Sequence, residues 1–177
     1  MSCIRLLLLF WSTETVGLPI SSNLHTFADI IDAKHKYTKN HSERVVFLSE
    51  KIARVLELSE AEIEKIRNAA HLHDIGKVYI PYEVLDEPGH LSDQKVDVMR
   101  KHAIITMEIL DTIEAFMDLS PTAGFHQERY DGKGYPDGLM EDDIPLGARI
   151  LCVADSVDAM LSDSVYRNGI GVVNTII

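Results

Sequence analysis

The chain has 177 residues, with 17 Lys and Arg against 28 Asp and Glu, so its formal net charge is −11 at pH 7. This acidic balance argues against the broad basic surface that non-specific nucleic-acid binding needs, and we expect no DNA partner. Hydrophobic residues make up 46% of the chain and charged residues 25%. That composition is typical of one globular domain and excludes a disordered chain or a multi-span membrane protein.

The cysteine content excludes a disulfide scaffold and a thiolate zinc site, because Cys3 and Cys152 lie far apart and form no C-x-x-C pair. We therefore predict a cytoplasmic protein in a reducing compartment. The apolar run at residues 4–11 is too short for a membrane helix of about 20 residues, so no stable membrane span is expected. Residues 1–27 form a separate amino-terminal segment, either packed on the core or the tail of an upstream domain, with a signal or anchor left open.

Helical periodicity begins at about Ala28 and predicts an all-α fold. Ser59 and Glu62 form a capping box at the start of a helix, and Gly76 marks a stop shortly after the pair His73-Asp74. The helix before Ser59 is expected at residues 38–58. Its buried face is predicted from residues at intervals of three and four: His41, Val45, Leu48, Ile52 and Val55.

The second half of the chain is expected to alternate helices with turn-rich loops. Residues 79–90 contain prolines and a glycine and predict a loop, and residues 92–113 predict a long helix. A short helix over residues 120–126 should carry His126, whereas the three glycines of residues 131–138 predict tight turns. The last clear helix should start at Pro145, with one side formed by Ala148, Leu151, Asp155 and Asp158.

Six residues with metal-binding side chains fall on the faces or ends of these helices: His41, His73, Asp74, His102, His126 and Asp155. The separations between successive candidate ligands, from 24 to 32 residues, each match one helix plus a returning loop, so a bundle can bring the six to one level. A single histidine on an apolar face is more often a hydrogen-bonded core residue than a ligand. Four buried imidazoles and two carboxylates all need partners, and divalent metal satisfies them together.

Two motifs in these segments resemble the HD-GYP family. The first is His73-Asp74-Ile75-Gly76-Lys77, and the second runs from His126 through Glu128-Arg129-Tyr130-Asp131-Gly132-Lys133 to Gly134-Tyr135-Pro136. With further agreement at residues 41–45, 144–150, 154–155 and 166–167, the resemblance spans about 140 of the 177 residues. We assign residues 28–177 to this domain. Because the family continues for another helix or two beyond this point, we expect a truncated carboxyl end.

The resemblance implies an HD-superfamily helical bundle with a Gly-rich GYP loop at the metal site. Members of the family are metal-dependent phosphodiesterases that hydrolyse cyclic di-GMP to pGpG or GMP in bacterial second-messenger signalling, and some act on related cyclic dinucleotides. The implied cofactors are two divalent metal ions, iron or manganese, with zinc left open. By the family pattern Asp74 bridges the ions, and the remaining ligands divide into His41, His73 and Asp155 on one ion and His102 and His126 on the other.

The resemblance also assigns the catalytic residues Asp74 and Lys77, with Lys77 placed against a phosphate oxygen. Substrate-binding roles fall to Lys77, Gly134, Tyr135, Pro136 and Arg167. The alternatives are an ordinary cation at a helix carboxyl end for Lys77 and a plain surface turn for the loop. The implied partners are cyclic di-GMP or a related cyclic dinucleotide, and a sensor, receiver or GGDEF domain, with a homodimer left open.

Three positions depart from the family pattern. Gln127 replaces a second histidine and Tyr37 replaces a glutamate found in three-ion members, which predicts at most two ions with a weakened hold on the second. Ser164 replaces a phosphate-binding arginine, although Arg167 follows one helical turn later. These changes favour one alternative, a catalytically degenerate module that binds a cyclic dinucleotide or a signalling domain. A second alternative, a general HD-type phosphohydrolase, is disfavoured by the segment 134–136.

Overall fold

The structure is a computed structural model that describes residues 40–161. The all-α prediction is confirmed, since these residues form helices and no strand, with one isolated bridge between Asp131 and Met140. Within the same range no helix is long and apolar enough to cross a membrane. Several predictions concern positions outside the described residues: the segment 1–27, Tyr37, Ser164, Arg167 and the carboxyl end.

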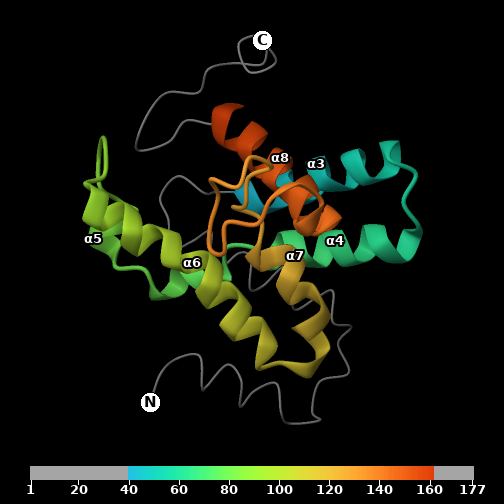
Figure 1. The fold of residues 1–177 in the computed structure, drawn as a ribbon, viewed down its shortest axis with the longest axis horizontal. Coiled ribbons are helices and arrows are strands. Elements are labelled where there is room, and N and C mark those ends of the chain that lie inside the picture. Colours follow the sequence, from blue (N-terminus) through green and yellow to red (C-terminus); the bar gives the residue numbers. More distant parts are fainter. Residues whose placement is uncertain (1–39, 162–177) are drawn as a thin grey trace.

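Helices α3 (His41–Val55) and α4 (Glu60–Leu72) form an antiparallel pair (Figure 1). Helix α3 is shorter than the predicted range 38–58, because Asn40 before it and Glu57 after it have left-handed backbones, with φ of 60° and 56°. The prediction that Val55 is buried is wrong. Its side chain is 82% exposed at the last position of α3, where the chain turns towards α4.

The capping box at the start of α4 is confirmed. The hydroxyl of Ser59 accepts a hydrogen bond from the backbone N–H of Glu62 (3.3 Å), and the Glu62 carboxylate accepts one from the backbone N–H of Ser59 (2.9 Å). These reciprocal bonds satisfy two backbone donors that the first turn of the helix leaves unpaired.

The middle of the chain contains one long helix flanked by short ones. After α4 come the 3-10 helix η1 (Ile75–Tyr79) and α5 (Tyr82–Leu85), a short helix within residues 79–90 that were expected to form a loop only. Pro81 precedes α5 with φ −59°, the angle to which its ring confines the backbone and which suits a helix start. Helix α6 (Asp93–Asp111) confirms the helix predicted at residues 92–113.

The segment after α6 differs from the prediction in one respect that concerns the candidate site. The 3-10 helix η2 (Glu114–Leu119) leads into α7 (Ser120–Gly124). The chain leaves helical geometry at Phe125 (φ −93°, ψ 14°). His126 therefore follows α7 instead of lying on it.

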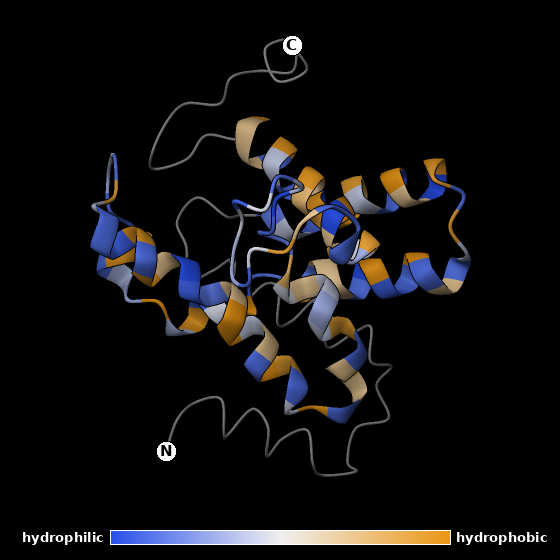
Figure 2. Ribbon diagram, in the orientation of Figure 1, coloured by the Kyte–Doolittle hydropathy of each residue, from blue (hydrophilic) through white to orange (hydrophobic). Residues whose placement is uncertain are grey.

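The last helix and the core complete the bundle. After the 3-10 helix η3 (Glu141–Asp143), α8 (Leu146–Leu161) starts next to Pro145 as predicted and packs against α3 and α7. Hydrophobic and hydrophilic residues alternate along the helices in the manner of amphipathic segments (Figure 2). The main core cluster includes Val45, Ile66, Leu72, Leu110, Phe116 and Leu151.

Gly76 sets how closely η1 approaches α6. A Cβ atom on Gly76 would lie 2.0 Å from the backbone oxygen of His102, a distance that no side chain tolerates. The backbone N–H of Gly76 donates to the Thr106 hydroxyl (3.0 Å), which donates to the backbone oxygen of His73 (3.0 Å). The predicted role as a helix stop is therefore replaced by one in packing: without a Cβ, the turn after α4 can lie directly on α6.

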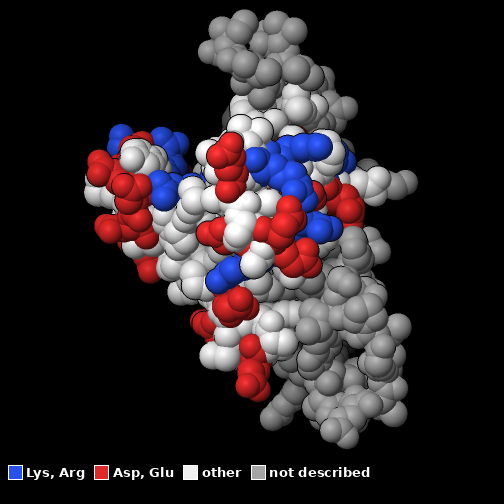
Figure 3. All heavy atoms as spheres, turned by 90° about the vertical axis from the view of Figure 1, so that its right-hand side faces the viewer, with Lys and Arg blue, Asp and Glu red and all other residues white. Residues whose placement is uncertain are grey.

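Acidic and basic side chains are interspersed on the face drawn in Figure 3. Several ion pairs join α3 and α4 or lie along them, among them Arg54 with Glu50 and Glu60, and Arg67 with Glu64. This face therefore offers no broad basic surface.

Candidate metal centre

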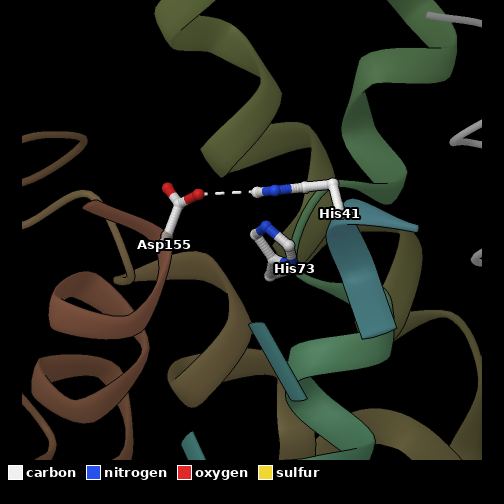
Figure 4. A group of neighbouring side chains, drawn as sticks. All are labelled: His41, His73 and Asp155. Carbon is white, nitrogen blue, oxygen red and sulfur yellow. Dashed lines mark ion pairs between the residues drawn. The ribbon is translucent and has the colours of Figure 1, made fainter. Parts of the chain in front are cut away.

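The six predicted ligand residues come from five segments and meet at one place. His41 is the first residue of α3, His102 lies within α6 and Asp155 within α8, while His73, Asp74 and His126 follow the ends of α4 and α7. All are buried except Asp155, which is half-buried. In Figure 4 the side chains of His41, His73 and Asp155 point toward one another from separate segments. Nε2 of His41 lies 3.3 Å from Oδ1 of Asp155.

Three of the histidines are oriented by the backbone carbonyl three residues earlier. Their Nδ1 atoms donate to Ala70 (His73, 2.7 Å), Met99 (His102, 2.7 Å) and Ala123 (His126, 2.6 Å). Because a carbonyl oxygen only accepts hydrogen bonds, Nδ1 carries the hydrogen in each ring, and Nε2 of the neutral ring carries a lone pair.

These lone pairs converge without a hydrogen between them. Nε2 of His102 and Nε2 of His126 are 3.4 Å apart, and Nε2 of the fully buried His73 has no hydrogen-bond partner among the described residues. Neutral imidazoles arranged in this way repel one another until a cation or a proton lies between them. The arrangement is that of a ligand set for a metal ion.

His41 is held by a carboxylate that the sequence analysis did not assign to the site. Asp158 accepts a hydrogen bond from Nδ1 of His41 (2.7 Å) and two from Arg44, from Nε (2.5 Å) and Nη2 (3.0 Å). Burial alone would raise the pKa of Asp158, but the bonds from His41 and Arg44 lower it. The ionised carboxylate therefore keeps the hydrogen of His41 on Nδ1 and directs Nε2 into the centre.

Asp74 lies among the histidines. Its Oδ2 is 3.4 Å from Nε2 of His73 and 3.8 Å from Nε2 of His41, and its Oδ1 is 3.6 Å from Nε2 of His102. Burial would raise the pKa of Asp74, but the Lys77 ammonium at 2.5 Å and the surrounding histidines hold it well below its usual value. Asp74 is thus an ionised carboxylate with one oxygen toward each side of the cluster.

Burial also controls the protonation of the histidines. It lowers the pKa of His126, with His73 and His102 adding to the effect, and lowers the pKa of His102 against the opposing charge of Asp74. Both rings are therefore neutral near pH 7, which is the form that binds metal. For His41, burial is outweighed by the bond to Asp158 and by the nearby carboxylates, which raise its pKa.

The donor atoms form two groups compact enough for a metal ion. Ligand atoms of His41, His73 and Asp155 lie within 4.8 Å of one another, and so do those of His73, Asp74 and His126. The first group has the membership implied by the family resemblance, whereas the second contains His73 where the resemblance implies His102. Imidazole nitrogen with carboxylate oxygen suits iron, manganese and zinc, so the residues present fit a divalent metal site.

The Gly-rich loop lies beside the cluster. A Cβ atom on Gly134 would be 2.3 Å from the backbone nitrogen of Arg129, so only glycine allows the loop to approach the chain after His126. The ring of Tyr135 lies 6.1 Å from the ring of His102 at an interplanar angle of 82°. The buried carboxylate of Glu128 holds the loop by accepting two bonds, from the backbone N–H groups of residues 137 (2.7 Å) and 138 (2.9 Å).

Gln127 also contacts the cluster. Its Nε2 donates a hydrogen bond of 3.1 Å to Oδ2 of Asp155, the carboxylate oxygen that does not face His41. The side chain that replaces a histidine is therefore a partner of a candidate ligand.

Sequence reasoning missed three residues that hold the cluster in place: Arg44, Thr106 and Asp158. All three carried a signal in their spacing. Thr106 lies four residues after His102, and Arg44 and Asp158 lie three residues after His41 and Asp155, so each shares a helical face with a predicted ligand. The contact between Arg44 and Asp158, which joins α3 to α8 across 114 residues, carried no such signal.

The fold and this cluster define a helical protein in which histidine and aspartate side chains from five segments form a candidate metal centre. Comparison with known families agrees: the model of the HD domain matches residues 25–176, and the chain belongs to this family. The family prediction made from the sequence is confirmed.

Curated relatives include the 3'3'-cGAMP-specific phosphodiesterase 3 of Vibrio cholerae, 43% identical over 80% of this chain and 31% of the relative. The cyclic di-GMP phosphodiesterase of Thermotoga maritima is 42% identical over 74% of this chain and 36% of its own length. The cyclic di-GMP phosphodiesterase response regulator RpfG of Xanthomonas campestris is 41% identical over 81% of this chain and 39% of its own length. The chain thus spans about a third of the length of the relatives it matches.

Proposed function

We propose that this chain is a metal-dependent phosphodiesterase domain that hydrolyses cyclic di-GMP, or a related cyclic dinucleotide such as 3'3'-cGAMP, to pGpG or GMP. The observation that carries the proposal is the convergence of histidine Nε2 atoms around the ionised Asp74. The support for the substrate class comes from the names of the relatives, which are cyclic di-GMP and 3'3'-cGAMP phosphodiesterases.

The proposed cofactors are two divalent ions, iron or manganese, with zinc as the other candidate. His41, His73 and Asp155 would hold one ion, His102 and His126 the other, and Asp74 would contact both. When bound, such ions neutralise phosphate charge and activate water for in-line attack. Gln127 supports a limit of two ions, because its amide donates to Asp155 and offers no imidazole nitrogen.

The protein's own groups would bind and orient the phosphodiester. Lys77, now paired with Asp74, would turn its ammonium toward a phosphate oxygen. The segment 134–136 would form one wall of the substrate site beside His102, and Arg167, outside the described residues, would contribute a second cation. The neutral rings of His102 and His126 need lose no proton before they coordinate metal.

The test is hydrolysis of cyclic di-GMP by chain reconstituted anaerobically with iron or manganese, with linear pGpG and GMP separated by chromatography. We expect turnover in the wild type and in His90→Ala, which changes an exposed histidine outside the cluster. His73→Ala should be inactive. Identical lack of turnover in wild type and His73→Ala would overturn the catalytic assignment, and faster turnover of a phosphomonoester would favour a general HD-type phosphohydrolase.

A second candidate is a catalytically degenerate module that binds the cyclic dinucleotide or a signalling domain. It is favoured by the bond between Gln127 and Asp155, since that carboxylate oxygen already has a partner. Fewer than about one bound ion per chain after reconstitution, measured by elemental analysis, would support this candidate.

The partners and location also belong to the proposal. A sensor, receiver or GGDEF domain would regulate the site, in keeping with the words "response regulator" in the name of the Xanthomonas relative. A homodimer and a cytoplasmic location stay predictions.

A further inference from the structure

Beside the candidate metal centre Arg100, a cation to which the proposed function gives no role, is paired with the ring of Tyr135. We propose that Arg100 and Tyr135 form a base-binding subsite that recognises a guanine of the cyclic dinucleotide. This inference rests on the proposed function, because it assigns a role in substrate recognition to residues that adjoin that site.

The geometry places the pair at the edge of the cluster. The guanidinium carbon of Arg100 lies 5.5 Å from the centre of the Tyr135 ring, within the range of a cation–π contact. The ring of Tyr135 also adjoins the ring of His102. Arg100 stands two residues before His102 in α6, so one helix carries both a candidate metal ligand and the cation.

Both side chains are suited to contact a ligand from solvent. The side chain of Arg100 is 55% exposed, and its carboxylate neighbour Asp97 lies at 4.0 Å, the outer limit of an ion pair. Tyr135 is half-buried. Its ring is therefore partly accessible for stacking, while the guanidinium keeps N–H donors for a ligand.

The chemistry of the pair favours guanine. Arg presents a planar fork of donors that matches the two acceptors of guanine, O6 and N7, and adenine has an amino donor where guanine has O6. Bases also stack on tyrosine rings without regard to sequence. The substrates named for the relatives, cyclic di-GMP and 3'3'-cGAMP, each contain at least one guanine. Tyr135 would thus stack on the base, and Arg100 would discriminate guanine from adenine.

The experiment measures the dissociation constants of cyclic di-GMP, 3'3'-cGAMP and cyclic di-AMP by calorimetry on the full chain reconstituted with manganese. We expect Arg100→Ala to weaken cyclic di-GMP binding about tenfold, which corresponds to ~1.4 kcal/mol, and to change cyclic di-AMP binding less than about twofold. Arg100→Lys should weaken cyclic di-GMP binding nearly as much as Arg100→Ala, because an ammonium lacks the planar fork of donors. The matched control is Lys101→Ala, which removes an exposed cation from the next position of α6.

Turnover of bis(p-nitrophenyl) phosphate, which has no base, separates this inference from the proposed function. It should be the same in Lys101→Ala and wild type, since that substitution touches neither the metal centre nor the subsite. Lack of turnover by the wild type refutes the catalytic proposal alone, because the dissociation constants still decide the subsite. Unchanged cyclic di-GMP binding in Arg100→Ala, equal weakening for all three dinucleotides, or no binding by the wild type would overturn the guanine subsite.

Discussion

Asp158→Asn is the substitution that tests most sharply how the cluster is organised. The Asp158 side chain is 4% exposed and accepts hydrogen bonds from His41 and from two nitrogens of Arg44. Asparagine has the same shape but only one accepting oxygen, and its amide group donates. Either His41 or Arg44 must therefore face a donor, and His41 is no longer constrained to keep its hydrogen on Nδ1.

The expected magnitude follows from these contacts. A buried hydrogen bond to a charged group contributes about 1.5–3 kcal/mol, and the 42% exposure of Arg44 reduces its share through solvent screening. We therefore expect the free energy of unfolding to fall by about 2 kcal/mol. Because partners that orient ligand histidines typically change metal affinity by about 10- to 100-fold, manganese binding should weaken by a factor in that range.

Urea denaturation of the metal-free protein and calorimetric titration with manganese measure the two effects separately. The control is Asp142→Asn, which removes an exposed partner of Arg149 and should change neither quantity. If Asp158→Asn lowered stability but left manganese affinity unchanged, Asp158 would be a packing residue and the proposed orientation of His41 would be refuted.

Three further substitutions test other parts of the structure. Gly76→Ala should lower the free energy of unfolding by about 1–3 kcal/mol and impair manganese binding, since the alanine Cβ would lie 2.0 Å from the backbone oxygen of His102. A melting temperature equal to that of the wild type would contradict the close packing of η1 on α6. Glu128→Ala should accelerate hydrogen exchange at the two loop amides that this carboxylate accepts, whereas Glu128→Gln, which keeps an accepting oxygen, should not. The bonds from Ser59 lower the pKa of Glu62 from 4.5, so the ionised carboxylate stabilises the fold above that pH. The difference in free energy of unfolding between wild type and Glu62→Gln should therefore shrink on acidification. A constant difference from pH 7 to 3 would contradict this.

The sequence predicted those features that depend on local chemistry. The capping box of Ser59 follows from cap preferences within one turn, and Ser92 occupies the predicted cap position of α6, although its side chain makes no cap hydrogen bond. The spacing of the six candidate ligands depends on helix length and loop length, and the structure brings them together. Local patterns failed at Val55, where a regular apolar stripe continued to the exposed last residue of α3.

What escaped prediction depends on contacts between distant segments. The role of Gly76 requires the position of α6, and the anchoring of His41 requires α8 to place Asp158 beside α3. The partner of Gln127 is 28 residues away. A single sequence carries no local sign of such pairs, because each side chain alone is also compatible with a solvated surface position.

The most direct test of the metal centre is a crystal structure of the manganese-reconstituted chain with anomalous scattering recorded at the manganese edge. Two anomalous peaks are predicted, one against Nε2 of His41 and His73 with Asp155, the other against His102 and His126, with Asp74 contacting both. Absence of peaks at this cluster while its side chains keep the present arrangement, or peaks bound only elsewhere on the chain, would contradict the account.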